Sequence, residues 1–305
     1  MCLALSTAWN SGHCLTAREI IDEIKELGFR AVELNFSLEA AIVDEISKLV
    51  DDKEIKVLSV HNYCPIPDGL SKEKALPDYY SLSSLNEEER QKAVYYTKKT
   101  IDTAKRVRAR VVILHCGRNE ITDHTRKLIG LYQKGLKDSE AFGQLKEQMH
   151  QEREKVAALH FECILKSLKE LTKYAQEKDV LLGIENRFYY REIPSLEEIG
   201  IILEEFKNQG VYYWHDFGHS RIFENLGLVG NGEYLNLYAD KLIGVHIHNV
   251  LNCVDHQSPL QGEIDFKQFR PYLKKETLKV VESHFPLADA NSLKESKYYL
   301  EEIFR

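Results

Sequence analysis

The sequence has no paired cysteine motif and no long apolar run. Six cysteines are spread over 305 residues without a Cys-x-x-Cys pair, which fits neither a secreted disulfide framework nor a zinc-thiolate site. We therefore expect reduced thiols. No apolar run approaches the roughly 18 residues that a membrane span needs, and residues 1–5 lack the basic start and small-residue cleavage site of a signal peptide. We expect a cytoplasmic protein without a membrane partner.

An excess of positive charge is also missing. The chain has 41 Lys+Arg against 48 Asp+Glu, a formal net charge of −7, which argues against nonspecific binding of nucleic acid. Its 43% hydrophobic and 29% charged residues are typical of a globular chain with a sizeable core, and exclude intrinsic disorder. The composition leaves assembly into homo-oligomers open. Twelve histidines are the feature that needs an explanation.

Short apolar runs alternate with longer amphipathic segments along the chain. The runs are residues 3–6, 31–34, 57–60, 111–114, 180–184, 211–214, 242–247 and 279–281. Such alternation is typical of βα units around a buried parallel sheet, and eight units in about 250 residues or more predict a closed (β/α)₈ TIM barrel. A doubly wound open sheet is the alternative, but no Gly-x-Gly-x-x-Gly follows the first run. We expect one α/β domain over residues 1–305.

The sequence also predicts where two helices begin and where one segment is inserted. Capping boxes stand at Thr16-x-x-Glu19 and Ser195-x-x-Glu198. Residues 144–178 contain neither Gly nor Pro, so the segment between strands four and five must hold more than one helix. We expect a barrel helix plus an inserted helical segment beside the barrel mouth.

A residue able to bind a metal or transfer a proton follows seven of the eight runs. These residues are Glu33, His61, His115, Glu185, Asp216, His246 and Glu282. The carboxyl ends of parallel barrel strands converge on one mouth, so these side chains are expected to meet. Buried carboxylates and imidazoles need a compensating cation. Mixed oxygen and nitrogen ligands without thiolates suit Zn²⁺, Mn²⁺, Co²⁺ or Mg²⁺, and the ligand types do not choose among these metals.

The two-residue period of a strand refines this set. If Asp216 points into the barrel, then Trp214 does too, while His215 points outward to the helices. His246 and His248 share the inward face by the same reasoning. We therefore expect His215 to be structural rather than a metal ligand.

Five motifs, in the same order along the chain, resemble those of the xylose-isomerase-like TIM barrels. They are Ile184-Glu185-Asn186, His215-Asp216-Phe217-Gly218-His219, Val245-His246-Ile247-His248-Asn249, Asp255-His256 with Gly262-Glu263-Ile264-Asp265-Phe266, and Val281-Glu282-Ser283. That superfamily joins sugar and sugar-phosphate isomerases and epimerases, inosose dehydratases and class II apurinic endonucleases. The resemblance extends over strands two to eight, and it implies a metal-dependent enzyme with a TIM-barrel fold.

The resemblance also implies which residues bind metal. The ligands of one divalent ion would be Glu185, Asp216, His246 and Glu282. His219 would lie beside that ion or on a second one. In the endonuclease branch, further metals are held by histidines after strands three and four, matched here by His61 and His115, and by an Asp-x-His pair. Here the pair reads Asp255-His256 without an intervening residue, which argues against a third metal and favours the sugar-isomerase branch.

Two enzyme classes fit these residues. The first is an isomerase or epimerase of a small sugar, polyol or keto-sugar, phosphorylated or not, in which the metal stabilises an enediolate and Glu185 and Glu282 accept and donate the proton. A dehydratase uses the same chemistry with loss of hydroxide. The alternative is a metal-dependent phosphodiesterase of the apurinic endonuclease type, favoured by His61, His115 and His219. The lack of an obvious basic patch for DNA argues against it.

Substrate contacts are less specific. His248 and His219 would orient hydroxyl groups. Arg118 and Arg187 either clamp a phosphate or carboxylate or form surface salt bridges. Glu33 either contacts substrate hydroxyls or pairs with a neighbouring loop.

Overall fold

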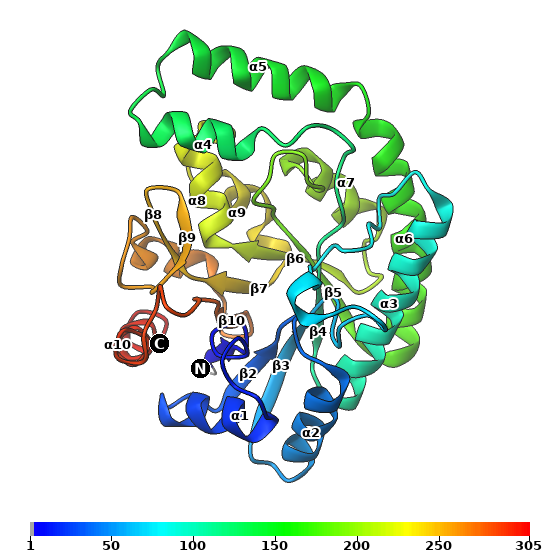
Figure 1. Cartoon of the computed structure of the whole chain (residues 1–305), viewed down its shortest axis with the longest axis vertical. Coiled ribbons are helices and arrows are strands. Elements are labelled where there is room, and N and C mark those ends of the chain that lie inside the picture. The colour runs from blue at the N-terminus through cyan, green and yellow to red at the C-terminus, as the bar shows by residue number, and fades with distance from the viewer. Residues whose placement is uncertain (1–2) are drawn as a thin grey trace.

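The computed structural model describes residues 3–305 and shows a closed barrel of parallel strands (Figure 1). The barrel strands are β1 (Leu3–Ser6), β2 (Ala31–Leu34), β3 (Lys56–His61), β4 (Val111–Leu114), β5 (Leu181–Glu185), β6 (Val211–Asp216), β7 (Leu242–Ile247) and β10 (Leu278–Val281). Their order around the barrel is β1-β10-β7-β6-β5-β4-β3-β2. The predicted (β/α)₈ barrel is confirmed, because each predicted run forms a barrel strand whose ends shift by two residues at most.

Helices cover the outside of the barrel. They are α1 (Ala17–Glu26), α2 (Ala40–Asp51), α3 (Glu87–Arg106), α6 (Ala157–Lys178), α7 (Leu196–Glu205), α8 (Phe217–Asn225), α9 (Glu233–Tyr238) and α10 (Ala290–Ile303), with 3₁₀ turns η1 (Lys72–Lys74), η2 (Ala239–Lys241) and η3 (Phe266–Tyr272). Both predicted capping boxes are present, at the starts of α1 and α7. Within residues 3–305, no helix combines the length and apolarity needed to cross a membrane.

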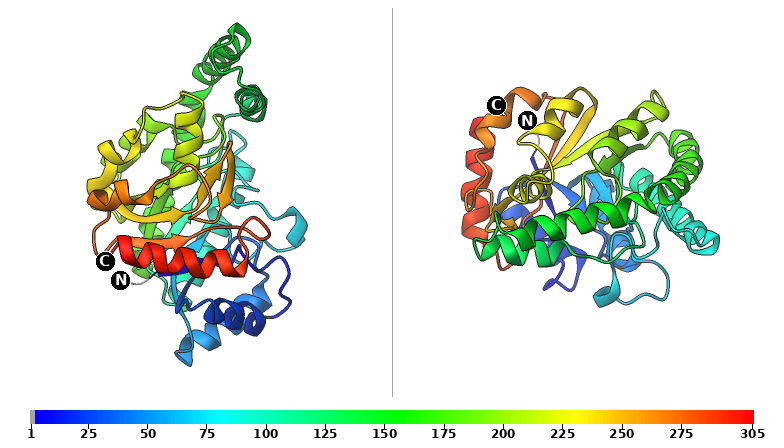
Figure 2. Two further views of the ribbon diagram at one scale, coloured as in Figure 1. Left: turned by 90° about the vertical axis from the view of Figure 1, so that its left-hand side faces the viewer. Right: turned by 90° about the horizontal axis from the view of Figure 1, so that it is seen from above.

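The predicted insertion between β4 and β5 is helical. It contains α4 (Thr125–Gln133) and α5 (Glu140–Glu154) ahead of the barrel helix α6, and Figures 1 and 2 show α4 and α5 lying beyond one end of the barrel. Arg153 Nη2 donates to Glu198 Oε2 over 2.6 Å, which ties α5 to the start of α7. Gln133 Nε2 donates to the carbonyl of Asn252 over 2.8 Å, so α4 also contacts the segment that follows β7.

That segment is an antiparallel hairpin of β8 (Asn249–Leu251) and β9 (Val254–Gln257), which the sequence reading did not anticipate. Its two turn residues, Asn252 and Cys253, both have positive φ, 52° and 59°. A two-residue turn of this kind favours Asn-Gly or Asp-Gly. Because Cys253 stands where such a turn usually has glycine, the sequence pattern did not predict this hairpin.

The thiols are reduced in the described part of the chain. Cys14, Cys64, Cys116, Cys163 and Cys253 are free, as expected. Cys2 lies outside the described residues.

The barrel interior is layered. An apolar floor of inward-facing residues consists of Ala4, Ala31, Val111, Ile113, Trp214, Ile243 and Val280. Two positions further along their strands, Ile113, Trp214 and Val280 are followed by inward-facing polar residues. Trp214 is the largest fully buried side chain, and its ring occupies the space in front of Gly244, where an added Cβ would come within 2.1 Å of Trp214 Cζ3. The floor therefore supports the polar layer above it.

We predict that Gly244→Ala destabilises the protein by about 1–3 kcal/mol, because the methyl group displaces the Trp214 ring in a packed interior. Urea denaturation measures the effect. Gly143→Ala, on α5 with no atom within 4 Å of the added Cβ, is the matched control and should be neutral or stabilising by up to about 1 kcal/mol. Equal stability changes in both variants would contradict the packing argument.

Candidate metal centre

Four buried side chains converge where β5, β6, β7 and β10 end. They are Glu185, Asp216, His246 and Glu282, whose ligand atoms all lie within 4.8 Å of one another. Nδ1 of His246 lies 2.7 Å from Glu185 Oε1, 3.0 Å from Glu282 Oε2 and 3.6 Å from Asp216 Oδ2. One imidazole nitrogen thus faces three carboxylates. We call this set the core group.

The core group fits a divalent cation. Three carboxylates that are at most 7% exposed would repel one another, and burying such charge is costly unless a cation compensates it. Arg187 offsets part of this charge, since its Nη1 donates to Glu185 Oε2 over 2.7 Å. Three oxygen donors and one imidazole suit the divalent metals proposed from the sequence.

Glu33 meets His246 of the core group, on the side opposite the other three carboxylates. It is fully buried, 3.0 Å from His246 Nε2 through its Oε1, and it accepts a hydrogen bond from Ser59 Oγ over 2.6 Å. By accepting the Nε2 proton of His246, Glu33 leaves the Nδ1 lone pair directed at the core group. In the described residues Glu33 therefore pairs with His246 and Ser59 rather than with a neighbouring loop, and its contact with substrate hydroxyls stays a prediction.

His61 and His115 form a second group with Glu185. His115 Nε2 is 2.8 Å and His61 Nε2 is 3.7 Å from Glu185 Oε2. His61 Nδ1 lies 3.0 Å from the carbonyl of Asn62, which favours a proton on Nδ1 and leaves Nε2 free to act as a ligand. The structure therefore places both histidines where a second metal could share Glu185 with the core group.

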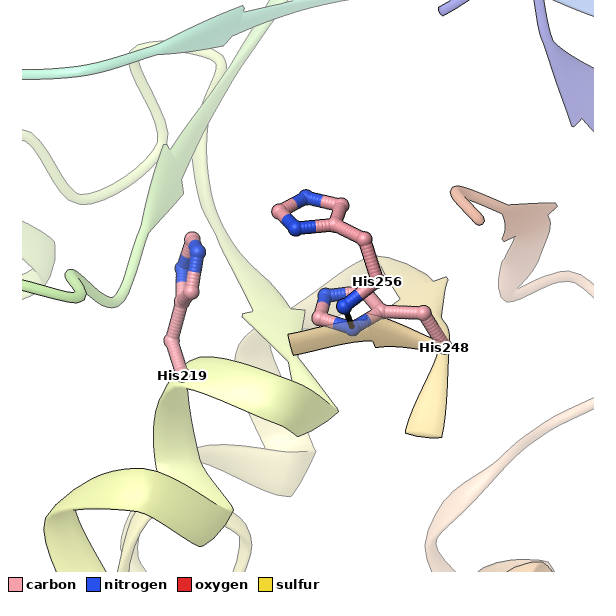
Figure 3. A group of neighbouring side chains, drawn as sticks. All are labelled: His219, His248 and His256. Atoms are coloured by element: carbon pink, nitrogen blue, oxygen red, sulfur yellow. Dashed lines mark hydrogen bonds between the residues drawn. The ribbon is translucent and has the colours of Figure 1, made fainter. Parts of the chain in front are cut away.

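A third group contains His219, His248 and His256 (Figure 3). His219 projects from α8, while the rings of His248 and His256 stack with centroids 4.3 Å apart. His248 Nε2 lies 3.0 Å from Asp216 Oδ2, and His256 Nδ1 lies 3.1 Å from Asp255 Oδ2. The third group thus adjoins the core group through Asp216.

The backbone of β9 explains how two adjacent residues reach this group. Successive strand residues normally point to opposite faces, so adjacent Asp255 and His256 would not be expected to reach one site. His256, however, has a φ of 55°, and this left-handed conformation interrupts the alternation. Asp255 and His256 both line the same cavity, so the departure in the sequence does not remove these ligand types from the site.

The charges of the groups are strongly coupled. Burial opposes ionisation of Glu185, but hydrogen bonds from His115 and His246 hold its pKa well below the ordinary value. Burial and the nearby charge of Glu33 raise the pKa of Glu282. Burial disfavours the charged form of His246, yet the carboxylates around it raise its pKa well above that of free histidine. The raised pKa favours the protonated form of His246, whose charge adds to that of Arg187 against these carboxylates.

A cavity of about 420 Å³ lies over the three groups. Its lining residues are Phe36, His61, Pro77, His115, Arg126, Glu185, Arg187, Phe188, Tyr189, His219, Asp255, His256, Glu282 and His284. A second cavity of about 350 Å³, between α5, α7 and α9, is lined by none of the residues expected in the site. The first cavity is therefore the one bordered by residues of all three groups.

Three residues expected to contact substrate differ in their access to the cavity. Arg187 lines the cavity but is paired, with Nη2 also 3.4 Å from Glu192 Oε1. Arg118 does not line the cavity and donates to Asp78 Oδ2 over 3.0 Å, in agreement with the salt-bridge interpretation. His248 is fully buried against Asp216 and is not a lining residue.

Two titratable residues of the lining, His284 and Arg126, were missed by sequence reasoning. His284 stacks on His256 with ring centroids 3.8 Å apart, and its spacing of two from Glu282 could have revealed it. Arg126 stands at the start of an inserted helix, where no strand-end pattern points to it.

His215 faces away from the core group, as the strand period predicts. Its Nδ1 lies 2.6 Å from the hydroxyl of Tyr213, and its ring meets that of Phe217 edge to face. Burial lowers the pKa of His215 to about 3. It is therefore a neutral packing residue on the outer face of β6.

The comparisons with known proteins agree with this fold. Residues 21–299 match the family model for the xylose isomerase-like TIM barrel, and the chain belongs to that family. A search of curated protein sequences returned no significant match.

Solved structures with the same fold have low sequence identity. The 3-keto-D-glucoside 4-epimerase of E. coli is 16% identical with a TM-score of 0.67, over 99% of both chains. The D-psicose 3-epimerase of Clostridium cellulolyticum is 13% identical with a TM-score of 0.67, over 100% of both chains. A Thermus thermophilus protein soaked with ZnCl₂ is 16% identical with a TM-score of 0.60, over 99% of this chain and 98% of that one.

We predict that His215→Ala keeps its bound metal but loses about 1–3 kcal/mol of stability, because a buried hydrogen bond and its packing are removed. Elemental analysis and urea denaturation measure the two effects. His246→Ala is the comparison variant and should lose the metal of the core group. Metal loss in folded His215→Ala would contradict the outward assignment.

We also predict that metal binding releases protons at pH 8. Burial opposes the charge on His256, but Asp255 outweighs it and raises the pKa of His256 to about 9, so the metal-free site holds a proton there that a ligand must lose. Affinity should therefore rise with pH up to about 9. Calorimetry in buffers of different ionisation enthalpy should find about one proton fewer released by His256→Gln. Equal proton release by both proteins would exclude His256 as a ligand.

Proposed function

We propose that this chain is a divalent-metal-dependent isomerase or epimerase of a small sugar, polyol or keto-sugar. The observation that carries the proposal is the convergence of the core group beneath the 420 Å³ cavity. A cavity of this size suits a small molecule. Membership of the xylose isomerase-like family supports the proposal, as does the likeness to sugar epimerases, although that likeness concerns the fold.

The core group would hold the cation through Glu185, Asp216, His246 and Glu282. When bound, a divalent cation favours the negative charge that develops on a carbonyl oxygen next to the reacting carbon. Both Glu185 and Glu282 line the cavity, and they come from β5 and β10, which are not neighbours in the barrel. One carboxylate can therefore accept a proton from carbon while the other returns a proton from a different side, as epimerisation requires.

The surrounding residues prepare these two carboxylates for different roles. Hydrogen bonds from Arg187 and His115 favour the ionised, proton-accepting form of Glu185. Within the described residues no arginine forms a salt bridge with Glu282, whose Oε2 lies 3.9 Å from His256 Nε2. We assign proton acceptance to Glu185 and proton donation to Glu282, with Glu33 orienting His246.

A phosphodiesterase of the apurinic endonuclease type is the second candidate. The observation in its favour is the pair of histidine groups that adjoin the core group, because clustered metals can activate water and stabilise a leaving oxygen. A duplex, however, must be gripped by several Lys and Arg side chains. Among the described residues that line the cavity, the arginines are Arg126 and Arg187, and there is no lysine.

We predict that the metal-loaded protein exchanges a C–H proton of a small ketose with solvent, and that Glu185→Gln and Glu282→Gln each slow the exchange by at least about 100-fold. Deuterium incorporation from D₂O, followed by NMR, measures it. Metal content must be determined for each variant, so that loss of proton transfer is separated from loss of metal. Glu205→Gln, at the exposed end of α7, is the control and should retain activity.

Absence of exchange over a panel of ketoses, together with metal-dependent cleavage of a duplex containing an abasic site, would transfer the assignment to the phosphodiesterase. Exchange that survives both Gln substitutions would overturn the roles given to the two carboxylates.

A further inference from the structure

Arg126 lines the cavity, and its positive charge is not balanced by a carboxylate of the described residues. It is exposed at the start of α4 and lines the same cavity as Glu185 and Glu282. Within residues 3–305, no carboxylate lies within salt-bridge distance of its guanidinium. Arg187, the other arginine of the lining, is paired with both Glu185 and Glu192.

The guanidinium of Arg126 is held by aromatic rings. Its Cζ lies 5.2 Å from the ring centroid of Tyr189 and 5.8 Å from that of Phe188, and Nη2 donates to the Tyr189 hydroxyl. Beside it, Thr125 Oγ1 accepts the backbone N–H of Tyr190 over 2.9 Å, which fixes α4 to the loop after β5. Stacking leaves most of the five N–H donors of an arginine free for another partner.

None of the carboxylates that line the cavity is paired with Arg126, and each already faces other groups. Glu185 contacts His115, His246 and Arg187. Glu282 contacts His246, and Asp255 contacts His256. These acids are also those that would surround bound cations. The free charge of the cavity is therefore positive, and it favours a ligand that carries its own negative group.

We propose that Arg126 binds an anionic group of the substrate, a phosphate or a carboxylate, at the end of the molecule away from the reacting carbon. The core group lies at the strand ends, whereas Arg126 belongs to the insertion beyond the barrel (Figures 1 and 2). One planar guanidinium matches one forked oxygen group. The cavity thus selects a small keto-sugar with one anionic terminus. The position of the reacting carbon at the core group rests on the proposed function, but the binding of an anion by Arg126 does not.

Three ligands that differ in one terminal group test the proposal. They are D-tagatose, D-tagatose 6-phosphate and D-tagaturonate, titrated by calorimetry into the metal-loaded protein. The wild type should bind at least one of the two anionic ligands about tenfold or more tightly than the neutral sugar. Comparison of the phosphate with the carboxylate decides which anion the site takes.

Arg126→Gln should lose this preference and leave the affinity for D-tagatose unchanged. Arg126→Lys should keep part of it, because a lysine provides charge without the planar fork. Lys127→Gln is the matched control, since it removes the next exposed cation of α4, which does not line the cavity. Its affinities should equal those of the wild type.

Four results would overturn the proposal: equal affinity of the wild type for all three ligands, a preference that survives Arg126→Gln, an equal loss for all ligands in that variant, or binding of none of them. An equal loss of affinity for all three ligands would show that Arg126 only shapes the cavity and does not recognise an anion. Survival would show that the anion binds to the metals instead. If the protein exchanges a C–H proton of the neutral ketose but shows no preference for an anionic ligand, this inference alone is wrong. If it prefers an anionic ligand but exchanges no C–H proton, only the proposed isomerase function is wrong.

Discussion

One imidazole surrounded by four buried carboxylates is the constraint on which the rest of the site depends. His246 contacts Glu33 through Nε2, and Glu185, Asp216 and Glu282 through Nδ1. So much negative charge is stable in a barrel interior only when it is balanced by a cation. Arg187, His115 and His248 each contact one of these acids, and their positions follow from that need.

The apolar floor makes this concentration of charge compatible with a folded barrel. Trp214 fills the interior below the acids, and glycines at positions 183 and 244 leave room for its ring. Because each strand alternates its faces, one register sets both the floor and the polar layer two residues further on. A shift of one residue would place ligands among the outer helices, where His215 lies.

Loops outside the barrel complete the site with features that strands cannot supply. The β8–β9 hairpin brings Asp255 and His256 together at the cavity, and the insertion brings Arg126. Barrels of this kind vary their chemistry through the loops at the strand ends while the sheet stays constant. Here the strand ends carry the core group that would hold a metal, and the segments outside the barrel add His256, a further candidate ligand, and Arg126.

The sequence by itself determined the barrel and the residues at its strand ends. Strand-length apolar runs and the two-residue period are local properties, so they place Asp216 inward and His215 outward without any knowledge of distant contacts. Only the tertiary structure brings Glu33 against His246, because those residues are 213 positions apart. It also decided that Asp255 and His256 line one cavity and that Arg126 has no carboxylate partner within residues 3–305. The positive φ at His256 and the contact of α4 with the loop after β5 arise from tertiary packing. Such packing produces no periodic pattern in the sequence, so it could not be predicted from the sequence.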